Sequence, residues 1–120
     1  MDKEAKIYDL KERIKKFCDD RDWDQFHNAK DLAIGAITEA SELLEHFRFQ
    51  SQAETESIMK SEIKRTEIAD ELADVLFFVL RIAEKYNFDL SQSVEIKLQK
   101  NAKKYPIQKA KAVHTKYDQL

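Results

Sequence analysis

The sequence predicts an all-α fold, an antiparallel four-helix bundle assembled as a homo-oligomer. Only one Gly and one Pro occur in 120 residues, whereas folds rich in strands need many turns and use more of both. Charged residues make up 37% of the chain and hydrophobic residues 42%, which fits amphipathic helices rather than disorder. Apolar residues also recur at helical spacing between recognisable helix caps.

The first two helices are predicted from periodicity and capping. One is expected over residues 3–19, because four apolar residues share a face there: Ile7, Leu10, Ile14 and Phe17. A polar and aromatic link follows it. The second helix is expected over residues 29–49, with Asn28 as its N-cap and Asp31 three positions later as a variant of the capping box.

The third helix is expected to be long, over residues 57–86. Residues 50–55 before it are polar, and we interpret them as a loop or a loosely held helix start. Residues 75–80 are apolar around the whole helix circumference, so they should be covered on more than one side. A bundle of this size covers a central helix poorly, which predicts a homodimer or a homotetramer with a dimer as its unit.

The fourth helix is expected to follow Asp89, an N-cap with Gln92 three residues later. It should end before Pro106, because proline disfavours helical geometry in the preceding residue. Residues 109–120 are expected to form a short helix or a tail. No repeat or domain boundary is visible, so we interpret residues 1–120 as one domain.

Charge, cysteine content and hydropathy exclude several classes of function. The net charge of −2 provides no general basic field for nucleic acid, although residues 97–116 are locally basic and leave an anion-binding patch open. The single Cys18 cannot form an intrachain disulfide, which fits a reducing compartment and a packed thiol. The charged N-terminus leads us to expect no signal peptide, and the apolar run at residues 75–80 is too short for a membrane span. We therefore expect a cytoplasmic protein that binds neither nucleic acid nor a membrane.

Two pairs of carboxylates stand out, Glu39-x-x-Glu42 on the second helix and Glu71-x-x-Asp74 on the third. Residues three apart share a helix face, so each pair directs two carboxylates the same way. If helix packing brings the pairs together, a cation must neutralise them, and oxygen ligands suit magnesium, manganese or calcium rather than zinc. The alternative is a solvated face paired with lysines, which the spacing alone favours.

Spacing leaves the placement of these acids open. On the second helix the pair lies away from the apolar stripe, which favours solvent exposure; the stripe is Ile34, Ile37, Ala40 and Leu44. On the third helix the pair borders the apolar stripe, which favours a lined cavity. Glu67-x-x-Asp70 has the same spacing as Glu71-x-x-Asp74, so spacing does not choose between the two registers.

A ferritin-like di-iron site is excluded, because it needs Glu-x-x-His pairs. The residues three positions before the histidines are Asp24, Leu43 and Lys111. We expect two of the histidines, His46 and His114, at the surface.

Four motifs follow one another along nearly the whole chain. They are Arg21-Asp22-Trp23-x-Gln25-Phe26-His27, Glu39-x-x-Glu42-Leu43-x-Glu45-x-Phe47, Glu71-Leu72-x-Asp74-Val75-Leu76 and Lys97-x-x-x-Asn101-x-x-Lys104-Tyr105-Pro106. With these motifs in this order, the chain resembles the MazG-like all-alpha nucleoside triphosphate pyrophosphohydrolases. It is most similar to the short group that includes the dCTP pyrophosphatases.

The resemblance implies that Glu39, Glu42, Glu71 and Asp74 bind Mg²⁺, with Mn²⁺ possible, and it favours that register over the neighbouring pair. It also implies dimers or tetramers of four-helix units with sites lined by more than one chain. The implied reaction converts a nucleoside triphosphate and water to a monophosphate and pyrophosphate. The metal would neutralise phosphate charge and orient or activate a water, while Glu42 or Glu39 accepts its proton.

Helix four offers the complementary charge. Lys97, Asn101 and Lys104 share a face with Tyr105 adjacent, and such a set suits phosphate oxygens, the alternative being a solvated basic face. Arg81 lies near the carboxylate face, where we expect it to hold phosphate or to pair with Asp74 or another acid.

The resemblance places the segment before the second helix near the nucleobase. Trp23 and Phe26 are therefore predicted to stack on the base, with core packing as the alternative, and His27 to hydrogen-bond its edge. Phe49 and Phe78 are predicted to complete the base site, at positions where close relatives often carry Trp and Tyr. Both keep a ring but lose a polar group.

Three hypotheses for function follow. The first is a pyrophosphohydrolase for nucleotide-pool house-cleaning, acting on a deoxynucleotide such as dCTP, with dATP or a modified pyrimidine triphosphate as alternatives. The second is a non-catalytic helical interaction module, such as a degenerate family member or an antitoxin-like adaptor, which the intact carboxylate set disfavours. The third is a dimeric dUTPase or a phosphoribosyl-ATP pyrophosphohydrolase, which the segment from Trp23 to His27 disfavours, as does the short chain in the case of the dUTPase.

Overall fold

The computed structural model describes residues 1–120, and every regular element is helical. The elements are α1 (Ile7–Asp20), η1 (Asp24–Phe26), α2 (Ala29–Glu45), α3 (Gln52–Lys60), α4 (Glu62–Lys85), α5 (Leu90–Lys104), α6 (Ile107–Ala110) and η2 (Tyr117–Gln119), where η marks a 3-10 turn. The predicted all-α class is confirmed. None of these helices combines the length and the apolar character that a membrane span requires.

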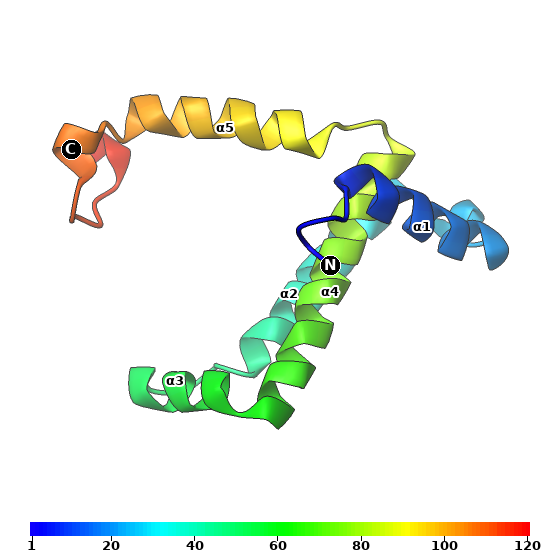
Figure 1. Ribbon diagram of the computed structural model, residues 1–120, viewed down its shortest axis with the longest axis horizontal. Helices are drawn as coiled ribbons and strands as arrows, with labels where there is room; N and C mark the ends of the chain where they lie inside the picture. Colours follow the sequence, from blue (N-terminus) through cyan, green and yellow to red (C-terminus); the bar gives the residue numbers. More distant parts are fainter. The chain divides into compact units, whose positions relative to one another are not determined.

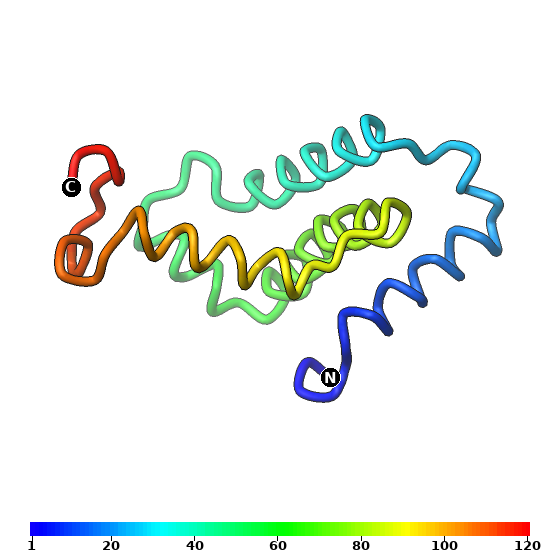
Figure 2. The backbone as a smooth tube through the Cα atoms, turned by 90° about the horizontal axis from the view of Figure 1, so that it is seen from above, coloured from blue at the N-terminus to red at the C-terminus, as the bar shows by residue number.

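The chain forms two compact units, residues Met1–Asn87 and Phe88–Leu120. In the first unit, α2 and α4 lie side by side and run antiparallel (Figures 1 and 2), and α1 and α3 also pack on α4. The second unit contains α5, α6 and η2. The predicted closure into a four-helix bundle, the oligomeric state and the single domain all remain predictions.

The predicted continuous helix over residues 57–86 is wrong, because the chain breaks at Ser61. This residue has an extended backbone with φ −79° and ψ 124°. Its hydroxyl accepts a hydrogen bond from the backbone N–H of Lys64 at 3.3 Å, so Ser61 ends α3 and caps the N-terminus of α4.

The polar segment at residues 50–55 is mostly helical rather than a loop. Ser51 and Glu54 form a reciprocal capping box, in which each side chain accepts a hydrogen bond from the other residue's backbone N–H, both at 3.1 Å. Two of the donors that a helix start leaves unpaired are therefore satisfied, and α3 begins at Gln52.

The other helices differ from prediction mainly at their ends. α1 begins at Ile7 rather than residue 3, and α2 ends at Glu45 rather than residue 49. Beyond α2 the chain turns and reaches φ 66° at Phe49, a left-handed conformation that a helix does not continue through.

α5 agrees with the prediction. Its N-cap Asp89 accepts a hydrogen bond from the N–H of Gln92 at 2.9 Å, and the helix ends just before Pro106. The predicted short helix or tail after residue 109 consists of the end of α6 and the turn η2.

The orientation of α2 reverses the sequence prediction. Residues of the predicted apolar stripe are exposed, by 50% to 68% for Ile34, Leu44 and Ile37. The helix packs through the face that carries the buried Leu32 and Gly35. A Cβ on Gly35 would lie 2.4 Å from the Phe78 ring, so glycine lets α2 approach this ring closely. Both acids of the α2 pair thus lie on the side that meets α4, where Glu39 is partly buried and Glu42 stays exposed.

The apolar core of the chain is small. Its buried residues are Cys18, Leu32, Ile68, Leu80 and Ala83. The burial of Cys18 confirms the predicted packed thiol. Because α4 contributes three of these residues, it forms the centre of the first unit. Within the apolar run at residues 75–80 only Leu80 is buried, whereas Leu76 and Val79 are exposed, so the predicted cover by a second subunit stays a prediction.

Candidate active site

The antiparallel contact between α2 and α4 brings carboxylates of both helices together. Glu39, Glu42 and Glu71 each place one oxygen within 4.8 Å of the others. Asp74 lies on the same face of α4 as Glu71 and acts electrostatically on both Glu39 and Glu71. Three of the four predicted ligands therefore form a cluster that the fourth borders, and we call these four residues the acid cluster.

Two atoms of the acid cluster lack partners within the chain. Glu39 Oε2 and Glu71 Oε2 are buried and accept no hydrogen bond. Burial raises the pKa of both carboxyl groups, as do the Glu42 carboxylate and the negative charge of Asp74. Buried carboxylate oxygens without partners are costly, and a divalent cation would satisfy them. An all-oxygen donor set of this kind fits Mg²⁺ or Mn²⁺.

The cluster selects one of the two acid registers on α4. Glu71 joins it, whereas Glu67 accepts a hydrogen bond from Lys64 at 3.1 Å and Asp70 is exposed. This agrees with the register that the family resemblance favours.

His46 is a neighbour of the acid cluster that the sequence prediction missed. Its Nδ1 lies 3.9 Å from a Glu67 oxygen and its Nε2 lies 3.9 Å from a Glu71 oxygen. The side chain is only 14% exposed, so the expected surface position is wrong. Its spacing could have predicted this position, because His46 follows Glu39 by seven residues and therefore shares its helix face.

Arg81 has a different environment from the one expected of a phosphate ligand. It is 1% exposed, and its guanidinium donates hydrogen bonds to Asp24 Oδ1 at 2.8 Å, to His27 Nδ1 at 2.9 Å and to Glu84. Of its two predicted roles, these contacts support pairing with an acid and not phosphate binding. The paired acids are Asp24 and Glu84 rather than Asp74.

The predicted base-binding residues before α2 lie around η1. Trp23 makes edge-to-face contacts with Phe17, at 5.5 Å between ring centroids, and with His27, at 6.3 Å. Phe26 is 65% exposed, so the alternative of core packing is wrong for it. An apolar groove of about 390 Å³ lies next to Phe17; its walls are Leu10, Arg13, Ile14, Phe17 and Phe77.

The other two predicted base-binding residues lie elsewhere. Phe78 packs on Gly35, one helical turn from Asp74 on α4. Phe49 is 89% exposed beyond the other end of α2, with the Arg48 guanidinium 4.7 Å above its ring. The 17 residues of α2 separate Phe49 from His27 by about 25 Å. Phe49 and His27 therefore do not line one pocket within a single chain.

The predicted phosphate-binding residues other than Arg81 belong to the second unit. Lys97, Asn101 and Lys104 lie on α5, and Tyr105 is its C-cap. The Lys104 ammonium lies 4.8 Å above the Tyr117 ring, and the Tyr105 ring also contacts Tyr117.

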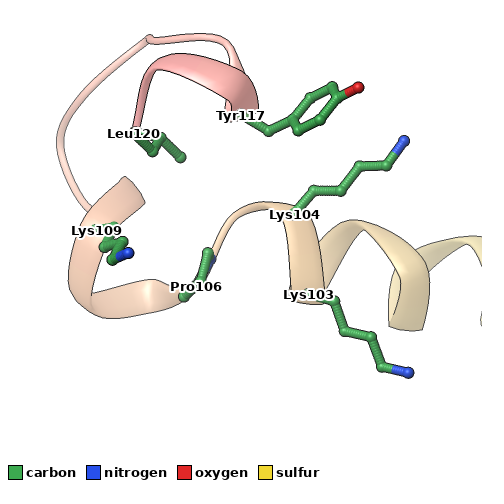
Figure 3. Close-up of a pocket in the computed structure, with 6 residues that line it drawn as sticks. All are labelled: Lys103, Lys104, Pro106, Lys109, Tyr117 and Leu120. Carbon is green, nitrogen blue, oxygen red and sulfur yellow. The ribbon is translucent and has the colours of Figure 1, made fainter.

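The end of α5 borders a basic pocket of about 380 Å³, lined by Lys103, Lys104, Pro106, Lys109, Tyr117 and Leu120. Figure 3 shows Tyr117 beside Lys104, whereas Lys103 leaves the helix on the other side. The locally basic tail thus folds around a cavity, but the ammonium groups of Lys103 and Lys104 do not converge in it.

Comparisons with known proteins identify the family and the fold of the chain. Residues 34–120 match the profile described as the MazG-like family. The chain is 30% identical to dCTP pyrophosphatase 1 of Rattus norvegicus and of Homo sapiens over 117 residues, which cover 98% of this chain and 69% of each relative. Its fold is similar to the crystal structure of a pyrophosphatase from Archaeoglobus fulgidus DSM 4304, with a TM-score of 0.77 and 32% identity over 82% of this chain and 91% of that one.

Proposed function

This chain belongs to the MazG-like family and is a nucleoside triphosphate pyrophosphohydrolase, and we propose that it hydrolyses dCTP to dCMP and pyrophosphate with Mg²⁺. The observation that carries this proposal is the convergence of Glu39, Glu42 and Glu71, with two buried oxygens that have no partner in the chain. The names of the relatives support the choice of dCTP. A role in nucleotide-pool house-cleaning follows from that substrate, and a cytoplasmic location stays a prediction.

We propose that the acid cluster, Glu39, Glu42, Glu71 and Asp74, holds the Mg²⁺, and that Mn²⁺ can replace it. When bound, the cation neutralises phosphate charge and polarises the reacting groups. Glu42 is the exposed glutamate of the cluster, whereas Glu39 has a buried oxygen. Glu42 is therefore better placed to take a proton from an attacking water, and we assign it the role of general base.

The substrate's phosphates and base need further contacts. We propose that Lys97, Asn101, Lys104 and Tyr105 of the second unit bind the phosphate oxygens, because amino and amide groups share one side of α5 and the phenol of its C-cap is adjacent. The base would lie against the aromatic residues around η1 and α4, Trp23, Phe26 and Phe78, where ring stacking contributes roughly 1–3 kcal/mol per base. His27 would contact the edge of the base.

A homodimer, or a homotetramer built from it, would complete the site. Phe49 and His27 flank opposite ends of α2, so one pocket can use both only if they come from different copies. The outer faces of α2 and α4 expose apolar side chains that a second copy would cover: Ile34, Ile37, Leu44, Leu72 and Leu76. Analytical ultracentrifugation tests this, and a chain that stays monomeric at micromolar concentration contradicts it.

A pyrophosphate-release assay across canonical and modified nucleoside triphosphates tests the function. We expect release that requires Mg²⁺ or Mn²⁺, with the highest kcat/KM for dCTP. Glu42→Gln should abolish release while the helical circular dichroism is kept. Glu67→Gln is the matched control, because this carboxylate lies on α4 outside the acid cluster and should leave the rate unchanged. Wild-type rates from Glu42→Gln would contradict the site, and no release from any triphosphate would contradict the function.

A further inference from the structure

Arg81 is the one buried charged residue of the chain. It follows Asp74 by seven residues, so it lies on the same side of α4, about 10 Å further along the helix axis. Its guanidinium reaches across to η1 and to His27, the residue before the N-cap of α2. Arg81 therefore connects α4 to the segment that the proposed function places at the nucleobase.

The two terminal nitrogens of Arg81 are held by acids. Nη2 donates to Asp24 Oδ1 at 2.8 Å, and Nη1 donates to Glu84 on the next turn of α4. Lys85 strengthens the same link, because its ammonium donates to Asp24 Oδ1 at 2.7 Å and to the Asp24 carbonyl oxygen at 3.2 Å. With both ends of the guanidinium fixed, the direction of its third donor, Nε, is fixed as well.

That third donor meets His27. Arg81 Nε lies 2.9 Å from His27 Nδ1. A guanidinium carries donors and no acceptor, so Nδ1 must be the unprotonated nitrogen of the pair. In a neutral imidazole the proton then resides on Nε2.

The surroundings of His27 also favour the neutral ring. Burial lowers the pKa of His27, the charges of Arg81 and Lys85 lower it further, and only Asp24 acts in the opposite direction. The Trp23 ring makes an edge-to-face contact with the imidazole, at 6.3 Å between centroids.

We propose that Arg81 is a positioning residue that holds His27 as a neutral imidazole with its proton on Nε2, so that His27 offers the substrate one hydrogen-bond donor and no acceptor. The statement that His27 contacts the nucleobase rests on the proposed function. The complementary group is an acceptor on the base edge, such as a carbonyl oxygen or an unprotonated ring nitrogen. A base that turns an amino group toward His27 is disfavoured, because two donors then face each other without a bond.

Nitrogen-15 NMR of the imidazole tests the tautomer in the substrate-free protein. We expect wild-type His27 to carry its proton on Nε2 at neutral pH. Arg81→Met should give a mixture of tautomers, whereas the matched control Lys85→Met should keep the proton on Nε2, because Lys85 does not contact Nδ1. A wild-type ring protonated on Nδ1, or an Arg81→Met spectrum like the wild type, would overturn the proposal. If Arg81→Met does not fold, the wild-type spectrum tests the proposal by itself, and a proton on Nδ1 of His27 overturns it.

Steady-state kinetics test whether His27 donates a hydrogen bond to the substrate. The amide nitrogen of Gln reaches the position of Nε2, whereas that of Asn reaches only the position of Nδ1. We expect His27→Asn to raise KM on the order of tenfold with little change in kcat, and His27→Gln to restore most of the loss. Equal KM values for the two variants would overturn the donor role.

The two experiments separate this proposal from the proposed function. If the NMR shows the proton on Nε2 but no triphosphate is hydrolysed, the function fails and the Arg81–His27 arrangement stands. If dCTP is hydrolysed but wild-type His27 carries its proton on Nδ1, only the arrangement fails.

Discussion

Two groups of charged side chains lie about two turns apart on α4, and they differ in how their charges are balanced. In the acid cluster, three carboxylates approach within 4.8 Å, and two of their buried oxygens have no partner. Around Arg81, by contrast, the guanidinium donates to two acids and a histidine, and Lys85 adds a second cation on Asp24.

The pKa values of the acids record this difference. Burial and neighbouring carboxylates raise the pKa of Glu39 and Glu71. The Lys85 ammonium and the Arg81 guanidinium instead hold the pKa of Asp24 below its usual value. Two buried oxygens of the acid cluster have no partner in the chain, whereas the charges of the Arg81 group are paired within the chain. Substitutions in the acid cluster should therefore affect mainly activity, and substitution of Arg81 should affect mainly stability.

The largest effect is expected from Glu42→Gln. Loss of the proposed general base should lower kcat by about 10²–10⁴-fold. The free energy of unfolding in the presence of a chelator should not fall, because the change removes one of several adjacent negative charges. Activity assays and urea denaturation measure the two quantities, and a large loss of stability would show that the acid cluster is structural.

Arg81→Met is expected to act mainly on stability. It leaves Glu84 and Asp24 without their guanidinium partner and breaks the link between α4 and η1. Removing one member of a buried ion pair costs about 3 kcal/mol or more. Urea denaturation should show this loss, whereas Arg13→Met, which removes a cation from an exposed position on α1, should change the unfolding free energy little. Equal stability of the two variants would contradict the comparison.

Mg²⁺ is expected to stabilise the folded chain through the acid cluster. At a concentration 100 times Kd, a ligand that binds only the folded state adds about 2.7 kcal/mol. The Tm should therefore rise with Mg²⁺ and return to its starting value with excess chelator. Glu39→Gln should reduce this shift and Arg81→Met should retain it; a shift that Glu39→Gln leaves intact would place the metal elsewhere.

The smallest effect concerns pH. His27 has a pKa below that of an unfolded histidine, about 6.5, so the unfolded chain takes up this proton first as the pH falls. The contribution of His27 to stability is therefore present above pH 6.5 and is lost as the pH drops below that value toward the folded pKa. Unfolding free energies at pH 7.5 and 5.5 should differ less for His27→Gln than for the wild type. An unchanged difference would contradict the assignment.

Local sequence signals predicted much of the fold. The periodicity of α1 and the caps Asn28 and Asp89 were interpreted correctly, since a cap bonds a backbone group only three residues away. The break at Ser61 was missed, because the apolar pattern continued across it and the serine was not recognised as a cap. These features depend on neighbours along the chain.

Contacts between distant residues decided the rest of the site. The acid pairs were predicted from spacing, but their meeting depends on the face that α2 turns toward α4, which Gly35 and Phe78 select by close approach. The hydrogen bond between Arg81 and His27 was not predicted, because the two residues lie 54 positions apart in the sequence.

The sequence by itself thus determined the helical class, most of the helices and the pairs of acids on α2 and α4. Each of these follows from residues one to seven positions apart, a range over which helix geometry is known in advance. Only the tertiary structure decided that Glu39 faces inward, that His46 borders the acids and that Arg81 holds His27. Those outcomes depend on which helix faces touch, and packing sets that only when the whole chain has folded.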